Sequence, residues 1–149
     1  MKKGEKRTVR EIMMASPVTL KPTDSLKLAS ELISLARLRH IPIVDNGKLL
    51  GVVSERDLMA RGAERIFNPK SRSRSALLNV VMLKEVMQRR VITVEPETSI
   101  QEAAHLMAER KIGCLPVLND GNLVGLVTTT DMLRYIEGLG MNSVNGGKT

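Results

Sequence analysis

An internal repeat constrains this 149-residue chain more than any other feature of its sequence. Shifting the sequence by about 74 residues aligns 10–59 with 84–133 without a gap, and roughly 13 of the 50 aligned positions are identical. Many other positions exchange one aliphatic residue for another. The identical pairs include Glu11 with Glu85, Met13 with Met87, Gly51 with Gly125, and Asp57 with Asp131. We therefore expect the chemistry of one copy to recur, in related form, in the other.

Both copies predict the same order of elements, β-α-β-β-α, after a short helical segment (REIM or KEVM). The first helix of copy one begins after Asp24 or Ser25, either of which can cap it, and that of copy two begins after Thr98 and Ser99, because apolar residues then follow at helical spacing. Asn46-Gly47 and Asp120-Gly121 favour two-residue hairpin turns, which need positive φ at both central positions. The predicted strands and second helices cover 18–20, 41–44, 49–54 and 57–67 in the first copy, and 92–94, 115–118, 123–128 and 131–140 in the second.

The repeat divides the chain into four predicted segments. Repeat 1 covers 8–63 and repeat 2 covers 83–138. A basic, Ser-rich linker covers 64–82, and a flexible C-terminal tail covers 139–149. Because a unit of about fifty residues is too small to bury both faces of a sheet, we expect the repeats to pack around a shared core. The predicted fold is an α/β (α+β) pair of tandem repeats related by a pseudo-twofold axis.

Composition limits the kinds of binding site and the cellular location that we expect for the protein. Aromatic residues make up 1% of the chain, which excludes a nucleic-acid site that stacks bases on aromatic rings. The single cysteine cannot form an internal disulfide, and the first ten residues lack the apolar core of a signal peptide. No apolar run approaches the ~18 residues of a membrane span. We expect a soluble, cytoplasmic protein.

The net charge of +7 lies in the first half of the chain. Residues 1–74 carry 16 basic and 8 acidic side chains, whereas residues 75–149 carry 7 and 8. This asymmetry has two interpretations. It is typical of a solvated tail and linker, and it also fits an anionic partner, either a nucleic acid or a phosphate-bearing ligand.

A hydroxyl followed three residues later by a carboxylate ends the last strand of each copy. The residues are Ser54 with Asp57 and Thr128 with Asp131. In a structural interpretation, the hydroxyl is a helix N-cap and the acid complements the helix dipole. In a functional interpretation, the same junction directs N–H groups and hydroxyls at phosphate, while the acid accepts both hydroxyl hydrogens of a ribose.

The whole unit resembles the CBS domain, the cystathionine β-synthase module, and two tandem copies resemble a Bateman module. The resemblance covers about 125 residues and rests on REIM and KEVM, VTL and ITV, RHIPIVD and GCLPVLN, and the closing pattern G-h-V-S/T-x-x-D. It implies a pseudo-twofold pair whose clefts bind adenosine nucleotides, often as a disk-shaped homodimer.

The resemblance also implies roles for individual residues. Asp57 and Asp131 match the acid that binds ribose, and Ser54 and Thr128 match the hydroxyl of the same loop. Arg56 and Thr130 match a position that often faces phosphate. The strands bordering the base are matched by Val18, Thr19, Ile92 and Thr93 on one side, and by Ile41, Pro42, Leu115 and Pro116 on the other.

The copies differ where phosphate would lie. Copy one has Arg39-His40 and Arg56, and copy two has Gly113-Cys114 and Thr130. Because arginine gives forked, charge-assisted hydrogen bonds to phosphate, we expect unequal sites, with Arg39, His40 and Arg56 strengthening the first. The alternative for Arg39 is an exposed cation near a helix C-terminus.

Other reactive side chains indicate no catalytic or metal site. Cys114 lies in an apolar strand and is expected to be an inert thiol, and His105 is expected on a helix surface. Two histidines and one cysteine are too few for a closed zinc site of the usual ligands. No nucleophile paired with a base is visible.

We therefore predict a non-enzymatic regulatory module that senses AMP, ADP or ATP without an obligatory cofactor. It would signal to an unknown effector protein. Alternatives are an S-adenosylmethionine-type ligand, or a nucleic-acid-associated regulator that uses the basic N-terminus and linker.

Overall fold

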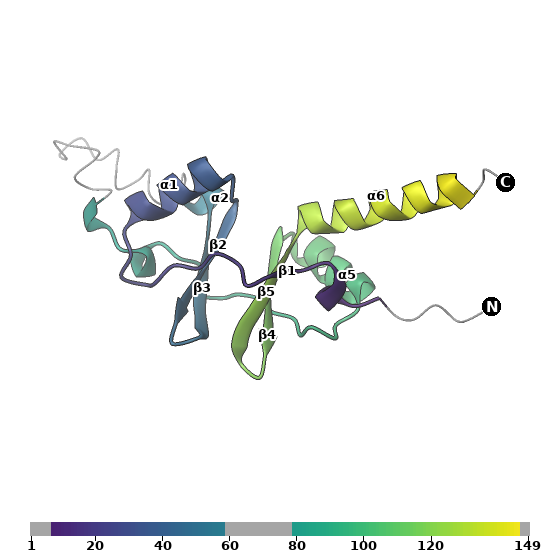
Figure 1. Cartoon of the computed structure of the whole chain (residues 1–149). Helices are drawn as coiled ribbons and strands as arrows, with labels where there is room; N and C mark the ends of the chain where they lie inside the picture. Colours follow the sequence, from purple (N-terminus) through teal and green to yellow (C-terminus); the bar gives the residue numbers. More distant parts are fainter. Residues whose placement is uncertain (1–6, 59–78, 147–149) are drawn as a thin grey trace. The chain divides into compact units, whose positions relative to one another are not determined.

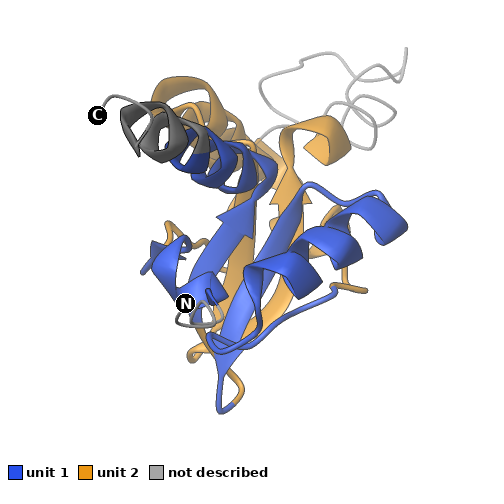
Figure 2. Cartoon of the chain, turned by 90° about the vertical axis from the view of Figure 1, so that its right-hand side faces the viewer, with its two compact units in different colours: residues 1–16, 92–120, 124–149 blue, residues 17–91, 121–123 orange. Residues whose placement is uncertain are grey.

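The computed structural model describes residues 7–58 and 79–146, which form two compact units. Figure 2 colours them separately: unit 1 comprises residues 1–16, 92–120 and 124–149, and unit 2 comprises residues 17–91 and 121–123. Unit 1 therefore holds most of repeat 2, and unit 2 holds most of repeat 1. The linker and helix predicted between residues 59 and 78 lie outside the described residues.

Unit 2 is built on an antiparallel hairpin of β2 (His40–Asp45) and β3 (Lys48–Ser54). The remaining elements of this unit are α1 (Leu26–Ala36), α2 (Glu55–Asp57) and the 3-10 turn η3 (Leu83–Glu85) (Figure 1). The extended segment predicted at 18–20 forms a single parallel bridge, Leu20 with Ile43. The Leu20 N–H donates to the Pro42 carbonyl, and the Val44 N–H donates to the Leu20 carbonyl.

Unit 1 repeats this arrangement with β4 (Cys114–Asn119) paired to β5 (Asn122–Thr128). It also contains η1 (Val9–Glu11), β1 (Met14–Ala15), α5 (Ile100–Arg110) and α6 (Thr129–Gly146). The predicted tail at 139–149 needs correction, because α6 continues through Gly146. The segment contains no proline, and glycine weakens a helix without ending it.

The hairpin turns are confirmed, and of the two caps predicted for the first helix it is Ser25, not Asp24, that accepts the capping bond. The Ser25 hydroxyl accepts the Leu28 N–H, and the Ser99 hydroxyl accepts the Glu102 N–H, both at 3.1 Å. These bonds satisfy backbone donors that the first turn of a helix leaves free. Both hairpin turns have two residues with positive φ, 50° and 79° at Asn46-Gly47, and 50° and 80° at Asp120-Gly121. Local chemistry therefore fixes where α1 and α5 begin and where the hairpins reverse.

Each compact unit contains a leading segment from the opposite repeat. We define the leading segments as residues 9–13 and 83–87. In unit 2 the Leu83 N–H donates to the Asp24 carbonyl at 2.9 Å, and in unit 1 the Val9 N–H donates to the Thr98 carbonyl at 2.8 Å. Figure 1 shows the turn at 83–85 beside the start of α1, and the turn at 9–11 beside α5. The repeats thus exchange their leading segments reciprocally.

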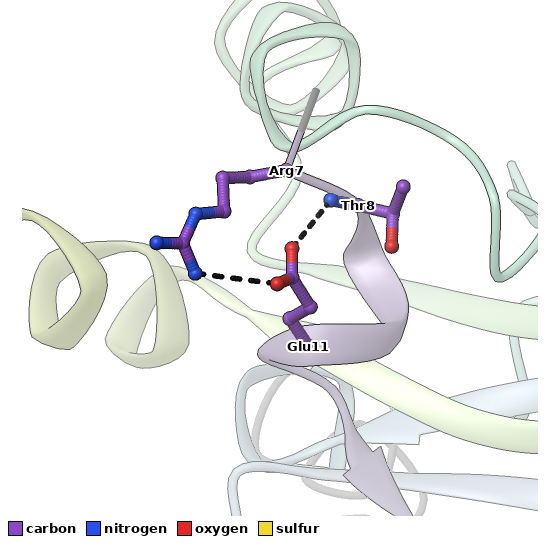
Figure 3. Close-up of polar contacts among 3 residues, drawn as sticks. All are labelled: Arg7, Thr8 and Glu11. Carbon is purple, nitrogen blue, oxygen red and sulfur yellow. Dashed lines mark hydrogen bonds and ion pairs between the residues drawn. The ribbon is translucent and has the colours of Figure 1, made fainter. Parts of the chain in front are cut away.

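The identical pair Glu11 and Glu85 holds the leading segments in their turns. Figure 3 shows the Glu11 carboxylate accepting the Thr8 N–H at 2.9 Å and pairing with Arg7 at 3.2 Å. At the matching place in the second copy, the Glu85 carboxylate accepts the Met82 N–H at 2.8 Å. In each case a side chain satisfies a backbone donor at the start of a 3-10 turn.

The buried apolar residues that the structure describes form two clusters, one in each unit. Leu83, Val86 and Met87 complete the cluster of unit 2, and Val9 is fully buried in the cluster of unit 1. The exchanged leading segment supplies apolar surface that each short repeat lacks. Within the described residues, no helix combines the length and apolar character needed to cross a membrane.

Candidate functional site

The junction of β3 and α2 is a helix cap, as one interpretation of the sequence predicted. The Ser54 hydroxyl accepts the Asp57 N–H at 2.9 Å. Ser54 and Asp57 are half-buried, whereas Arg56 between them is exposed. The hydroxyl, the guanidinium and the carboxylate belong to four consecutive residues, and the cap fixes the first turn of α2 that carries them.

Two contacts bring the start of β2 to the same place. The Glu55 N–H donates to the Arg39 carbonyl at 2.9 Å, and His40 lies opposite Ser54 in the β2–β3 register. We call this strand-end cluster site 1, and its members are Arg39, His40, Ser54, Arg56 and Asp57. The structure therefore assembles five predicted site residues at one end of the hairpin.

His40 has a buried ring nitrogen, Nδ1, that makes no hydrogen bond to the described residues. Burial lowers the pKa of His40 from its usual value near 6.5, the Asp57 carboxylate opposes this effect, and the Arg39 guanidinium adds to it. The surroundings of His40 therefore favour the neutral imidazole.

Site 2 is the matching strand end of unit 1, defined by Gly113, Cys114, Thr128, Thr130 and Asp131. The Thr129 N–H donates to the Gly113 carbonyl at 3.1 Å, as Glu55 does to Arg39 in site 1. Burial, reinforced by the charge of Asp131, raises the pKa of the Cys114 thiol to about 12. The thiol is protonated near neutral pH, as expected for an inert cysteine.

Asp57 and Asp131 have different hydrogen-bond partners, although both match the same motif in the sequence. The Asp131 carboxylate accepts the Thr128 N–H at 2.8 Å and the Thr128 hydroxyl at 3.1 Å. Across the described residues, the Asp57 carboxylate accepts no hydrogen bond. Asp131 completes a capping arrangement, whereas Asp57 keeps its acceptor capacity. Nothing in the pattern S/T-x-x-D reveals this difference.

The residues predicted to border the base differ in accessibility. Val18, Thr19 and Thr93 are exposed and Ile92 is half-buried. The side chains of four others belong to the core, so they can offer a ligand only backbone groups: Ile41, Pro42, Leu115 and Pro116. The Pro42 and Pro116 carbonyls already accept the N–H groups of Leu20 and Val94.

Among the described residues, no three or more His, Cys, Asp or Glu side chains cluster in a way that could hold a metal ion. His105 lies exposed on α5. The polar chemistry of both sites therefore consists of carboxylate, hydroxyl and, in site 1, guanidinium and imidazole groups. These are groups that bind sugar hydroxyls and phosphate.

Comparison with known sequences matches both repeats to one family. The model of the CBS domain matches residues 9–64 and 83–138. CBS domain-containing protein DDB_G0289609 of Dictyostelium discoideum is 30% identical over 127 residues, which cover 84% of this chain and 88% of that protein. The uncharacterized protein MJ1232 of Methanocaldococcus jannaschii is 34% identical over 121 residues, covering 80% of this chain but 36% of that protein. The chain thus spans about a third of MJ1232.

Solved structures have the same fold. A Vibrio cholerae protein provisionally described as an acetoin utilization protein (AcuB) is 36% identical, with a TM-score of 0.80 and coverage of 94% of this chain and 98% of that one. CBSX2 in complex with AMP is 26% identical, with a TM-score of 0.74 and coverage of 90% and 98%. The CBS domain pair of MJ0100, in complex with 5′-methylthioadenosine and S-adenosyl-L-methionine, is 26% identical, with a TM-score of 0.73 and the same coverage.

Proposed function

Because this chain belongs to the CBS domain family, we propose that it is a regulatory module that binds an adenosine nucleotide at its strand-end sites. The AMP complex of CBSX2 supports this ligand class. The module would act in the cytoplasm, without an obligatory cofactor and without catalysing a reaction. Its output would be a change of conformation that a partner protein detects.

One observation carries the proposal: the Asp57 carboxylate of site 1 is half-buried and accepts no hydrogen bond among the described residues. A carboxylate in this state can accept both hydroxyl hydrogens of a ribose without breaking an existing bond. Arg56, directly before Asp57, and Arg39, directly before β2, are both exposed. Their guanidinium groups suit forked, charge-assisted hydrogen bonds to phosphate.

The base would lie against the extended segment that precedes Leu20. This segment is parallel to β2, with Leu20 beside Ile43. Thr19 and Val18 therefore lie progressively nearer to the His40 end of β2. Val18 is 46% exposed and offers an aliphatic surface to an adenine ring. Specificity for the base would come from backbone groups, since the side chains of Ile41 and Pro42 are buried.

Site 2 should bind the same ligand more weakly. Both hydrogen bonds from Thr128 fall on Oδ2 of Asp131, so this carboxylate has fewer free acceptor positions for ribose hydroxyls than that of Asp57. Thr130 and Gly113 also stand where site 1 has Arg56 and Arg39, so phosphate meets neutral groups. Ile92, Thr93, Leu115 and Pro116 would border the base as their counterparts do in site 1.

Signalling would follow from differential affinity. A ligand shifts a conformational equilibrium only by the difference between its affinities for the two conformations. We propose that nucleotide binding favours one conformation of a homodimer, as the family resemblance implies, and that an effector protein binds that conformation. The larger relatives suggest that such modules also occur within enzymes, since the chain spans 24% of a homoserine O-acetyltransferase and 24% of an inosine-5′-monophosphate dehydrogenase.

S-adenosylmethionine or 5′-methylthioadenosine is the second candidate ligand, favoured by the MJ0100 complex. These ligands share the adenosyl group with AMP but lack its phosphate. A role in binding nucleic acid would depend on the basic segments at 1–6 and 64–82, of which 1–6 and 64–78 lie outside the described residues.

Ligand release and competition test the proposal. Mass spectrometry of small molecules freed by denaturing the purified protein should detect an adenosine nucleotide. Equilibrium dialysis with radiolabelled AMP, competed by ADP, ATP and S-adenosylmethionine, then ranks the candidates. If only phosphate-bearing ligands displace AMP, the result supports an adenosine nucleotide as the ligand. If S-adenosylmethionine displaces AMP more strongly than the nucleotides do, the result supports the second candidate. Absence of saturable binding for every ligand contradicts the proposal.

A further inference from the structure

His40 combines burial, an unsatisfied ring nitrogen and charged neighbours at the proposed phosphate position. Its Nδ1 has no partner among the described residues, and its backbone lies opposite Ser54 of β3. Two charged groups act on the ring: the Asp57 carboxylate from α2 and the Arg39 guanidinium preceding β2. At this register position β3 contributes the uncharged Ser54, and Glu55 and Arg56 are exposed.

The charge balance of this cluster changes when an anion binds. Without ligand, burial favours the neutral imidazole, because a cation loses hydration there. A phosphate beside Arg39 and Arg56 adds negative charge on the same side as Asp57. Both negative groups favour the imidazolium. The neutral ring has one N–H donor, whereas the imidazolium has two and can therefore donate one more hydrogen bond.

We infer that His40 takes up a proton from solvent when an anionic ligand occupies site 1, so that affinity at this site increases as the pH falls. The inference rests on the proposed function, since it needs a phosphate-bearing ligand at site 1. By linkage, the factor by which the ligand favours the protonated ring equals the factor by which protonation favours the ligand. His40 thereby couples nucleotide sensing to pH.

Site 2 lacks this coupling. Cys114 occupies the position of His40, and its thiol stays neutral throughout the pH range in which a histidine titrates. A His40→Cys variant therefore converts the titrating position of site 1 into that of site 2. His40→Gln is a second variant that keeps a polar, uncharged side chain of similar reach.

Histidine NMR tests the inference directly, because the chain has only two histidines. Imidazole signals of the wild type should be followed from pH 5 to pH 8 without ligand, with AMP and with adenosine. We expect AMP to raise the pKa of His40 and adenosine to leave it unchanged. The signals of His105, which lies exposed on α5 and outside both sites, serve as the internal reference. AMP binding with an unmoved or lowered pKa of His40 overturns this inference alone, whereas absence of AMP binding overturns the proposed function as well.

Calorimetry gives an independent measurement. For each protein, the quantity to compare is the AMP affinity at pH 6 divided by that at pH 8. This ratio should be about threefold larger for the wild type than for His40→Gln. This division removes the titration of the AMP phosphate, whose second pKa is near 6. His105→Gln should behave as the wild type and His40→Cys as His40→Gln. Equal pH dependence in the wild type and both His40 variants contradicts the inference.

Discussion

Replacing Gly51 with alanine tests how the leading segment of repeat 2 packs in unit 2. A Cβ added at Gly51 would lie 2.7 Å from the Gln88 carbonyl oxygen and 2.9 Å from the Met87 sulfur. Val52 and Gln88 also exchange two backbone hydrogen bonds, of 3.0 and 2.9 Å, so the backbone at 88 is held in place. We expect this overpacking to lower the free energy of unfolding by about 2 kcal/mol.

Thermal melting followed by circular dichroism provides the measurement. For a chain of this size about 2 kcal/mol corresponds to about 4–8 °C, and the transition that includes unit 2 should shift by that amount. Hydrogen exchange at the amides of Val52 and Gln88 should accelerate in Gly51→Ala, because the added methyl pushes the backbone at Gln88 away from β3.

Two other glycines serve as matched controls. At Gly125 the nearest neighbour of an added Cβ is the flexible side chain of Met13, and the closest backbone atom, the Met14 oxygen, is 3.2 Å away. Gly125→Ala should therefore destabilise less than Gly51→Ala. Gly138 has no neighbour within 4 Å and lies inside α6, so Gly138→Ala should stabilise by about 0.5–1 kcal/mol. A Gly51→Ala protein that melts with the wild type and keeps both amides protected refutes the exchanged packing.

Three further predictions follow from single side chains. Ser99→Ala removes the buried N-cap of α5 and should cost about 1 kcal/mol in urea unfolding, whereas Ser34→Ala on the exposed side of α1 should change little. The Cys114 thiol, with a pKa of about 12, should react with a thiol reagent at pH 8 far more slowly in the native protein than in denaturant; equal rates would contradict its burial. Because burial lowers the folded-state pKa of His40, the unfolded chain binds that proton more tightly. The free energy of unfolding should therefore fall as pH drops below about 6.5, a dependence that His40→Gln should reduce.

Features set by local chemistry could be predicted from the sequence. Ser25 and Ser99 cap helices because a serine oxygen reaches an N–H three residues on, whatever the tertiary surroundings. Asn46-Gly47 and Asp120-Gly121 form the turns that their tolerance of positive φ favours. The order of the described elements in each repeat followed from these signals and from apolar periodicity.

Features that depend on distant pairing could not be predicted. The leading segments have the same pattern of apolar and charged residues in both repeats, so nothing in Val9 or Leu83 specifies which repeat each completes. The extent of α6 was also wrong, because the end of the chain was expected to be a flexible tail, whereas α6 continues through Gly146.

Within the candidate site, residue types were predictable but their partners were not. Asp57 and Asp131 share a motif, yet only Asp131 is bonded by the hydroxyl three residues before it. Whether a threonine or serine hydroxyl donates to the acid or only accepts its N–H depends on side-chain orientation. The burial of His40 Nδ1 likewise arises from packing around the strand end.

Calorimetric titration of AMP into the wild type, Asp57→Asn and Asp131→Asn tests the central claim most directly. Asparagine keeps the shape of the side chain but loses the charge and one acceptor that a ribose would use. We predict saturable binding in the wild type, a loss of at least about tenfold in the tighter phase for Asp57→Asn, and little change in that phase for Asp131→Asn. Equal affinity in all three proteins, or binding lost only in Asp131→Asn, would contradict the assignment of site 1 as the principal nucleotide site.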